Sequence, residues 1–154
     1  SKYTTEEAPP KYLCKPGDLL VLLTDLTPTC ELLGKPLEVS EQDGNVLLNQ
    51  RVAKIELVSN VVLKTFLKQF FLTESYNEVI VATASGSTVK HSSNKVLLNM
   101  EVVLPCVEEQ QRIADCLSSL DTRITAETSQ LAALKTHKQG LMQQLFPAPE
   151  AAQV

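Results

Sequence analysis

The stretch EEQQRIADCLSSLDTRITAETSQLAALKTHKQGLMQQL, residues 108–145, decides the fold, because it has no proline and its single glycine, Gly140, lies near its end. Glu108 and Glu109 open it, and the dipole of a helix favours acidic residues in its first turn. The pattern predicts one helix of 38 residues, about 55–60 Å long at 1.5 Å per residue. Phe146-Pro147 ends this helix, and the tail 148–154 is predicted to be disordered.

Apolar residues recur along this helix at steps of three and four, which is typical of a coiled-coil seam. They are Ile113, Leu117, Leu120, Ile124, Leu131, Leu134, Leu141 and Leu145. Because the helix is about twice as long as a small domain is wide, the stripe predicts pairing with another helix, and an antiparallel homodimer would provide one. The alternative is a helix that breaks at Ser118-Ser119 or Gly140 and folds back.

The residues before the helix mix strand and helix patterns. Leu19 to Leu23 follows a Pro-Gly-Asp turn and is too short for a helix, so it predicts a buried strand. Residues 24–45 predict a long loop, and 46–57 contain a second strand.

A helix is expected from Val61 to about Thr73, with Asn60 as its N-cap. Residues 79–82 fit either a strand or a short helix, and 96–98 and 100–104 predict the last strands. The fold class is therefore α+β: a small mixed α/β domain of about 105 residues, followed by one long C-terminal helix that forms a coiled coil.

Charge is distributed unevenly along the chain, although the net charge is only −4. Residues 1–48 carry −4 and residues 96–154 carry −3, whereas residues 49–95 hold six basic and three acidic side chains and carry +3. The negative total argues against indiscriminate nucleic-acid binding. The positive charge is concentrated in the middle third, although clustering of this kind also arises by chance on many protein surfaces.

The segment TASGSTVKHSS, residues 83–93, lies in this positive region. It combines hydroxyl side chains, one glycine and two potentially cationic residues between apolar runs. Glycine allows backbone amides to approach phosphates closely, and hydroxyl and ammonium groups donate to phosphate oxygens. The simpler interpretation is a plain solvent loop.

No catalytic or cofactor site is predicted. Gly86 is not followed by the Gly-Lys-Ser/Thr of a phosphate-binding loop. The four cysteines match no zinc-ligand spacing and the chain has only two histidines, so reduced thiols and no bound metal are expected. With no apolar run of about 20 residues and no signal peptide at its start, the chain is expected to be cytoplasmic.

Five segments together resemble the specificity subunits of type I restriction–modification enzymes. The most specific are Leu104-Pro105, Glu109-Gln110 and Ile113-Ala114 within VVLPCVEEQQRIADCLSSLDTRI (102–124), and Lys138 to Phe146 within LKTHKQGLMQQLF (134–146). PGDLLVLLTDLTP (16–28), LLNQRVAKIEL (47–57) and ASGSTVKHSS (84–93) come in the family's order. The resemblance implies a target recognition domain over residues 1–105, N-terminally incomplete, and a spacer and subunit-contact helix over residues 106–147.

This resemblance implies sequence-specific binding of double-stranded DNA, without catalysis by this chain. Modification (methyltransferase) subunits and a restriction subunit would be its partners, and S-adenosylmethionine, ATP and Mg²⁺ would belong to them. The expected DNA-binding residues are Thr24, Asp25, Asn49, Gln50, Arg51, Ser85, Gly86, Ser87, Thr88, Lys90 and His91. For Asn49 and Gln50, backbone hydrogen bonding beside a strand is an equal alternative. The alternative function is an interaction scaffold on a coiled-coil stalk, without a DNA role.

Overall fold

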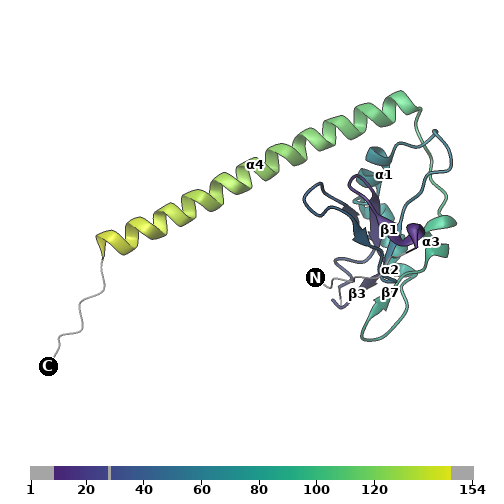
Figure 1. The fold of residues 1–154 in the computed structure, drawn as a ribbon, viewed down its shortest axis with the longest axis horizontal. Helices are drawn as coiled ribbons and strands as arrows, with labels where there is room; N and C mark the ends of the chain where they lie inside the picture. The colour runs from purple at the N-terminus through teal and green to yellow at the C-terminus, as the bar shows by residue number, and fades with distance from the viewer. Residues whose placement is uncertain (1–8, 28, 147–154) are drawn as a thin grey trace. The chain divides into compact units, whose positions relative to one another are not determined.

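The computed structural model describes residues 9–27 and 29–146. The chain divides into two compact units, one ending at Ala114 and the other beginning at Asp115. The predicted disordered tail lies outside the described residues. The elements (Figure 1) are a 3-10 helix at Pro10–Tyr12, β1 (Leu13–Cys14), β2 (Leu19–Leu22), β3 (Thr24–Asp25), β4 (Pro36–Glu38), β5 (Val46–Leu47), β6 (Val52–Lys54), α1 (Lys64–Phe70), α2 (Glu74–Ala82), β7 (Lys90–His91), α3 (Asn94–Leu98) and α4 (Val107–Leu145).

Short antiparallel ladders form the β part of the first unit. β2 lies between β4 and β6, with Leu20 opposite both Leu37 and Lys54. Separate pairs join β1 to β5 and β3 to β7. The predicted strand at Leu19 to Leu23 is confirmed as β2, whereas the predicted loop 24–45 contains β3 and β4.

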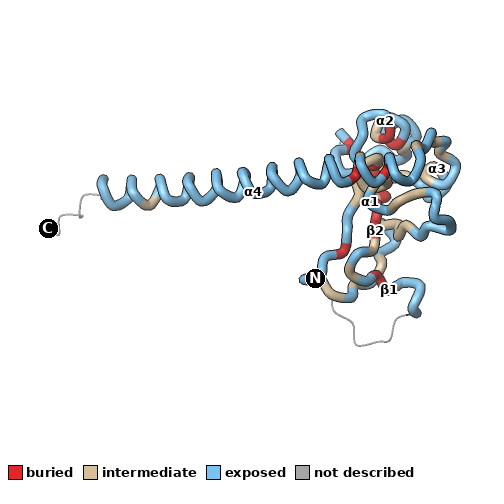
Figure 2. Tube along the Cα trace, turned by 90° about the horizontal axis from the view of Figure 1, so that it is seen from above, coloured by how far each residue is buried: buried red, intermediate tan, exposed pale blue. Residues whose placement is uncertain are grey.

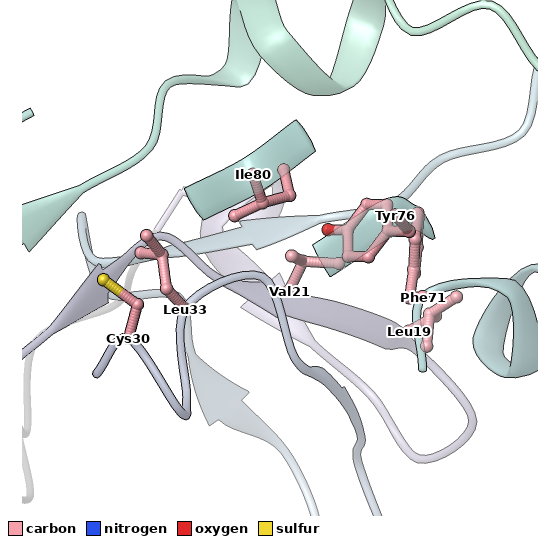
Figure 3. Packing of buried hydrophobic residues seen from close by; sticks show 7 residues of the cluster. All are labelled: Leu19, Val21, Cys30, Leu33, Phe71, Tyr76 and Ile80. Carbon is pink, nitrogen blue, oxygen red and sulfur yellow. The ribbon is translucent and has the colours of Figure 1, made fainter. Parts of the chain in front are cut away.

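The core lies on one side of β2, where alternate residues point the same way. Leu19 and Val21 pack there with Cys30 and Leu33 from the following loop, and with Phe71, Tyr76 and Ile80 around α2 (Figure 3). Tyr76 donates from its hydroxyl to the Gly34 carbonyl at 3.0 Å, so its one polar atom is satisfied inside the core. Burial raises the pKa of Tyr76, which therefore stays neutral.

The structure corrects the predicted start of one helix and the predicted last strands, and it settles one alternative that the sequence left open. The helix expected from Val61 begins only at Lys64, so Asn60 is not its cap. Residues 79–82, left open between strand and helix, are helical. The expected strand at 96–98 is part of α3, and 100–104 has no regular structure, because apolar runs this short do not distinguish strand from buried helix.

The long helix is confirmed: α4 runs unbroken from Val107 to Leu145, including Ser118-Ser119 and Gly140. Its apolar stripe is exposed from Leu117 onward, and Figure 2 shows the helix exposed along most of its length. Within the described part of the chain, no helix has the length and hydropathy needed to cross a membrane.

Candidate nucleic-acid interface

Leu23 joins the separate segments that contain the predicted DNA-binding residues. Its N–H donates to the Arg51 carbonyl at 2.8 Å, and its carbonyl accepts from the Ser92 N–H at 2.9 Å. The loop that ends at Arg51 and the strand that precedes Ser92 therefore flank β3. Residues 24–25, 49–51 and 85–92, which are far apart in sequence, therefore adjoin one another at Leu23. The exposed side chains of these three segments are the surface around Leu23.

β3 and β7 carry the centre of this surface (Figure 1). Thr24 lies opposite His91, and Asp25 lies opposite Lys90. His91 also pairs with Ser85 through reciprocal backbone hydrogen bonds of 2.8 and 2.9 Å. Residues 86–90 are therefore closed into a tight loop between two paired positions.

Gly86 is required by the geometry of this loop. Its φ of +99° is one that side chains disfavour, and a Cβ there would lie 2.1 Å from the Val89 carbonyl oxygen. Ser87 and Thr88, which follow it, are exposed. The loop thus presents two hydroxyl groups to solvent on a fixed backbone.

The second part of the surface is the turn Asn49–Arg51, whose three side chains are exposed. Asn49 Oδ1 accepts from the Arg51 N–H at 3.0 Å, which occupies the amide oxygen and leaves its Nδ2 as a donor. Asn49 and Gln50 line an open hollow of about 460 Å³ with Tyr12 and Asn94. Tyr12 and Asn94 were missed from the sequence, because no motif there distinguishes them.

Asp25 does not take part in the exposed surface, although it was predicted to. Its side chain is buried, with the residue 3% exposed, and its carboxylate accepts from the N–H groups of Thr27 (2.7 Å), Leu32 (2.6 Å) and Leu33 (3.1 Å). Burial raises the pKa of this carboxyl, but these hydrogen bonds outweigh it and hold the pKa below its usual value. The buried and ionised carboxylate of Asp25 therefore holds the loop after β3 in place through these three hydrogen bonds.

The cations of the positive middle third divide into two groups. Lys54 lies 2.7 Å from Asp18, Lys68 lies 2.6 Å from Glu38, and Lys64 donates to the Gly17 carbonyl. Arg51, Lys90 and Lys95, among the described residues, form no ion pair. Two of these three, Arg51 and Lys90, lie in the segments around Leu23 and are available to an external anion there.

This geometry suits contact with an anion. Within the ranges that the structure describes, no group of three or more His, Cys, Asp or Glu residues is placed to hold a metal ion. The predicted helix-pairing residues from Leu117 onward lie in the other unit. The surface around Leu23 combines hydroxyl groups, amides, a guanidinium and an ammonium group.

Residues 23–136 match the family described as type I restriction modification DNA specificity domain. The chain belongs to this family. The EcoBI specificity subunit of Escherichia coli is 32% identical over 132 residues, 85% of this chain and 25% of that subunit. The MjaVIII specificity subunit of Methanocaldococcus jannaschii is 27% identical over 100 residues, 65% of this chain and 23% of that subunit. This specificity domain thus spans about a quarter of each of these curated relatives.

Solved structures show the same fold. The S subunit of a type I restriction-modification system from M. genitalium superposes with a TM-score of 0.67 at 21% identity, over 91% of this chain and 35% of that one. A chain solved in work on complex assembly and conformational transition of a type I system gives 0.64 at 20% identity, over 88% and 31%. The predicted α+β class with a long C-terminal helix is confirmed, and family membership does not favour the scaffold alternative.

Proposed function

We propose that the first unit binds double-stranded DNA as one target recognition domain of a type I restriction–modification complex. The observation that carries this proposal is the convergence on Leu23 of three segments that hold the predicted DNA-binding residues. Membership of the DNA specificity domain family supports the same role.

The surface has two kinds of contact to offer. Phosphates fix the position of a protein on a duplex, and base edges specify the sequence. Ser87, Thr88 and Lys90 are suited to phosphate oxygens, as are the amides beside Gly86. Gln50 and Arg51 have the donors and acceptors that read adenine and guanine in the major groove, with Asn49 Nδ2 beside them.

Thr24, Ser85 and His91 complete the predicted set from the β3–β7 ladder. Thr24 is half-buried, whereas Ser85 and His91 are exposed. We assign them to the edge of the DNA contact, where their side chains flank the loop 86–90. Asp25 contributes only by holding the loop after β3 in place.

The chemistry of modification and cleavage belongs to other subunits in this proposal. Modification subunits bind S-adenosylmethionine and methylate DNA, and the restriction subunit uses ATP and Mg²⁺. The present chain directs them to a site without taking a catalytic role, in the cytoplasm where such complexes work.

The long helix provides the surface for a second helix, and we assign an antiparallel homodimer to it. Residues 107–127 hold five acidic and two basic side chains, whereas 128–146 hold two basic and no acidic ones. Antiparallel pairing places each negative half beside a positive half, whereas parallel pairing places like charges together. The exposed stripe from Leu117 to Leu145 is the apolar seam of this pair.

Salt-dependent binding to duplex DNA tests the DNA role. The logarithm of affinity falls with the logarithm of salt concentration, with a slope of about −0.9 per neutralised phosphate. Fluorescence anisotropy on labelled duplex should show a slope that becomes shallower by about one unit in Lys90→Ala, if Lys90 contacts a phosphate.

Lys68→Ala is the matched control, because Lys68 is already paired with Glu38 at 2.6 Å. Its salt slope should equal that of the unmodified chain. A chain whose affinity does not depend on salt, or equal slopes for the Lys90 and Lys68 variants, would count against the proposed surface.

A further inference from the structure

The open hollow of about 460 Å³ beside Leu23 combines apolar and amide side chains. The more buried part of its lining is apolar, since Leu23 is buried and Leu48 and Val52 are half-buried. The exposed polar and aromatic part of the lining consists of Tyr12, Asn49, Gln50 and Asn94. Because Asn49 and Gln50 also belong to the surface around Leu23, the hollow is continuous with that surface.

Backbone hydrogen bonds hold Tyr12 and Asn94 at this hollow, although neither belongs to the predicted DNA-binding set. The Tyr12 carbonyl accepts from the Leu48 N–H at 2.7 Å, directly before the turn that carries Asn49 and Gln50. Asn94 begins α3, two residues after Ser92, whose N–H donates to the Leu23 carbonyl. Three segments distant in sequence therefore bring their side chains to one hollow on a fixed backbone.

These side chains match the major-groove edge of an A·T base pair. Adenine presents an acceptor at N7 and a donor at N6, which a side-chain amide can satisfy together, and thymine presents a methyl group for apolar contact. Exposed amides above apolar side chains provide both kinds of contact. Guanine presents two acceptors, which Arg or Lys reads best. Of the described residues that line the hollow, none is Arg or Lys.

An ammonium group lies beside the hollow. Lys11 is exposed, and its Nζ lies 4.8 Å from the centroid of the Tyr12 ring. Lys11 also lines an adjoining depression that shares Leu48, Val52 and Asn94 with the hollow. A cation next to a base-reading site suits the phosphate backbone, because phosphate contacts fix the position of a protein on a duplex.

We infer that this hollow reads one A·T base pair in the major groove. The amides of Gln50 and Asn94 hydrogen-bond the adenine edge, the thymine methyl packs against Tyr12, and Lys11 contacts a neighbouring phosphate. This rests on the proposed DNA role and extends it to three residues of the segments 10–12 and 94–98 that the sequence did not indicate.

Selection of binding sites from a pool of random duplexes tests the amide contact on the full chain. Sequencing of the bound duplexes should show a position at which A·T is preferred. Asn94→Ala should lower the preference at that position about fivefold or more, the discrimination that a good amide–adenine contact provides. Asn99→Ala is the matched control, because Asn99 is an exposed asparagine at the other end of α3 and does not line the hollow.

The thymine contact is tested on one selected duplex, with deoxyuridine in place of the thymine at that position. This change removes only the methyl group, so the unmodified chain should bind about fourfold more weakly by fluorescence anisotropy. Tyr12→Ala should bind the two duplexes equally. Lys11→Ala should make the salt slope shallower by about one unit and leave the base preference unchanged.

The outcomes separate this inference from the DNA role on which it rests. A chain that binds no duplex in a salt-dependent way overturns both. Salt-dependent binding with the same base preferences in Asn94→Ala and Asn99→Ala, or with no base preference, overturns the reading of a base pair and leaves the DNA role intact. A preference for G·C at the position that Asn94 controls, or equal binding of the thymine and uracil duplexes by the unmodified chain, also overturns it.

Discussion

Replacing Gln110 by methionine should destabilise the first unit by about 3 kcal/mol, counting about 1 kcal/mol for each lost hydrogen bond. Gln110 is fully buried at the start of α4. Its Oε1 accepts from the Leu63 N–H at 2.9 Å, and its Nε2 donates to the carbonyls of Val61 at 2.8 Å and Pro105 at 2.9 Å. One amide thus ties α4 to the segment that leads into α1.

Methionine is chosen because it keeps the length and approximate volume of glutamine, so little cavity is added. A buried donor or acceptor that has neither a protein partner nor water lowers the stability of the fold by about 1–3 kcal/mol. Val61 is 61% exposed, so water can reach its carbonyl, which places the total near the lower end of the range. The expected loss of stability is therefore the net value of three hydrogen bonds. It is smaller than the cost of leaving three buried polar groups without any partner.

Urea unfolding followed by tyrosine fluorescence measures this effect, because Tyr12 and Tyr76 both lie in the first unit. With an m value of about 2 kcal/mol/M, the midpoint should fall by about 1.5 M. Gln130→Met is the control, since Gln130 is exposed on the same helix. Equal midpoints for the Gln110 and Gln130 variants would refute the role assigned to this amide.

Three other substitutions test individual contacts. Gly86→Ala should destabilise the loop by about 1–3 kcal/mol and speed amide exchange at Ser85 and His91, whereas Gly44→Ala, also at positive φ but with open space around its Cβ, should cost less. Asp25→Asn should be less stable than the unmodified chain above the ordinary aspartate pKa of 3.8, and this difference in stability should shrink as the pH falls below it. The reason is that a lowered pKa stabilises the fold only while the carboxyl is ionised. A difference in stability that does not depend on pH, measured by urea titration, would contradict this. Tyr76→Phe should cost about 1 kcal/mol through loss of its bond to Gly34, and exposed Tyr12→Phe should cost nothing measurable in the same unfolding assay.

The parts of the fold that sequence predicted are those where local pattern and tertiary packing agree. The continuous apolar run at Leu19 has the length of a strand and is fully used by the core. The stretch after Pro105 has no proline and has apolar residues at steps of three and four, so its local pattern and the observed helix agree. The segments around Thr24, Asn49 and Lys90 were predicted together to bind DNA. The sequence did not predict that Leu23 would bring them together through its hydrogen bonds to Arg51 and Ser92.

The errors come from hydrogen bonds that form only once the chain has folded. Leu63 and Val61 are held out of α1 by Gln110, which lies 47 and 49 positions away, so Asn60 never becomes a cap. Asp25 was predicted to be exposed to DNA, but its carboxylate accepts hydrogen bonds from the Leu32 and Leu33 N–H groups in the loop that follows β3. These bonds exist only when that loop has folded back onto Asp25. Apolar and polar patterns in the sequence therefore predicted neither the Gln110 contacts nor the burial of Asp25.

The central claim is that the surface around Leu23 contacts DNA, and an amide NMR titration of the full chain with a short duplex tests it most directly. Perturbed amides should cluster at residues 49–51 and 85–92, while those at Leu57, Leu98 and Leu104, exposed apolar residues outside that surface, should not move. Perturbations confined to these three leucines, or none at low salt, would contradict the account.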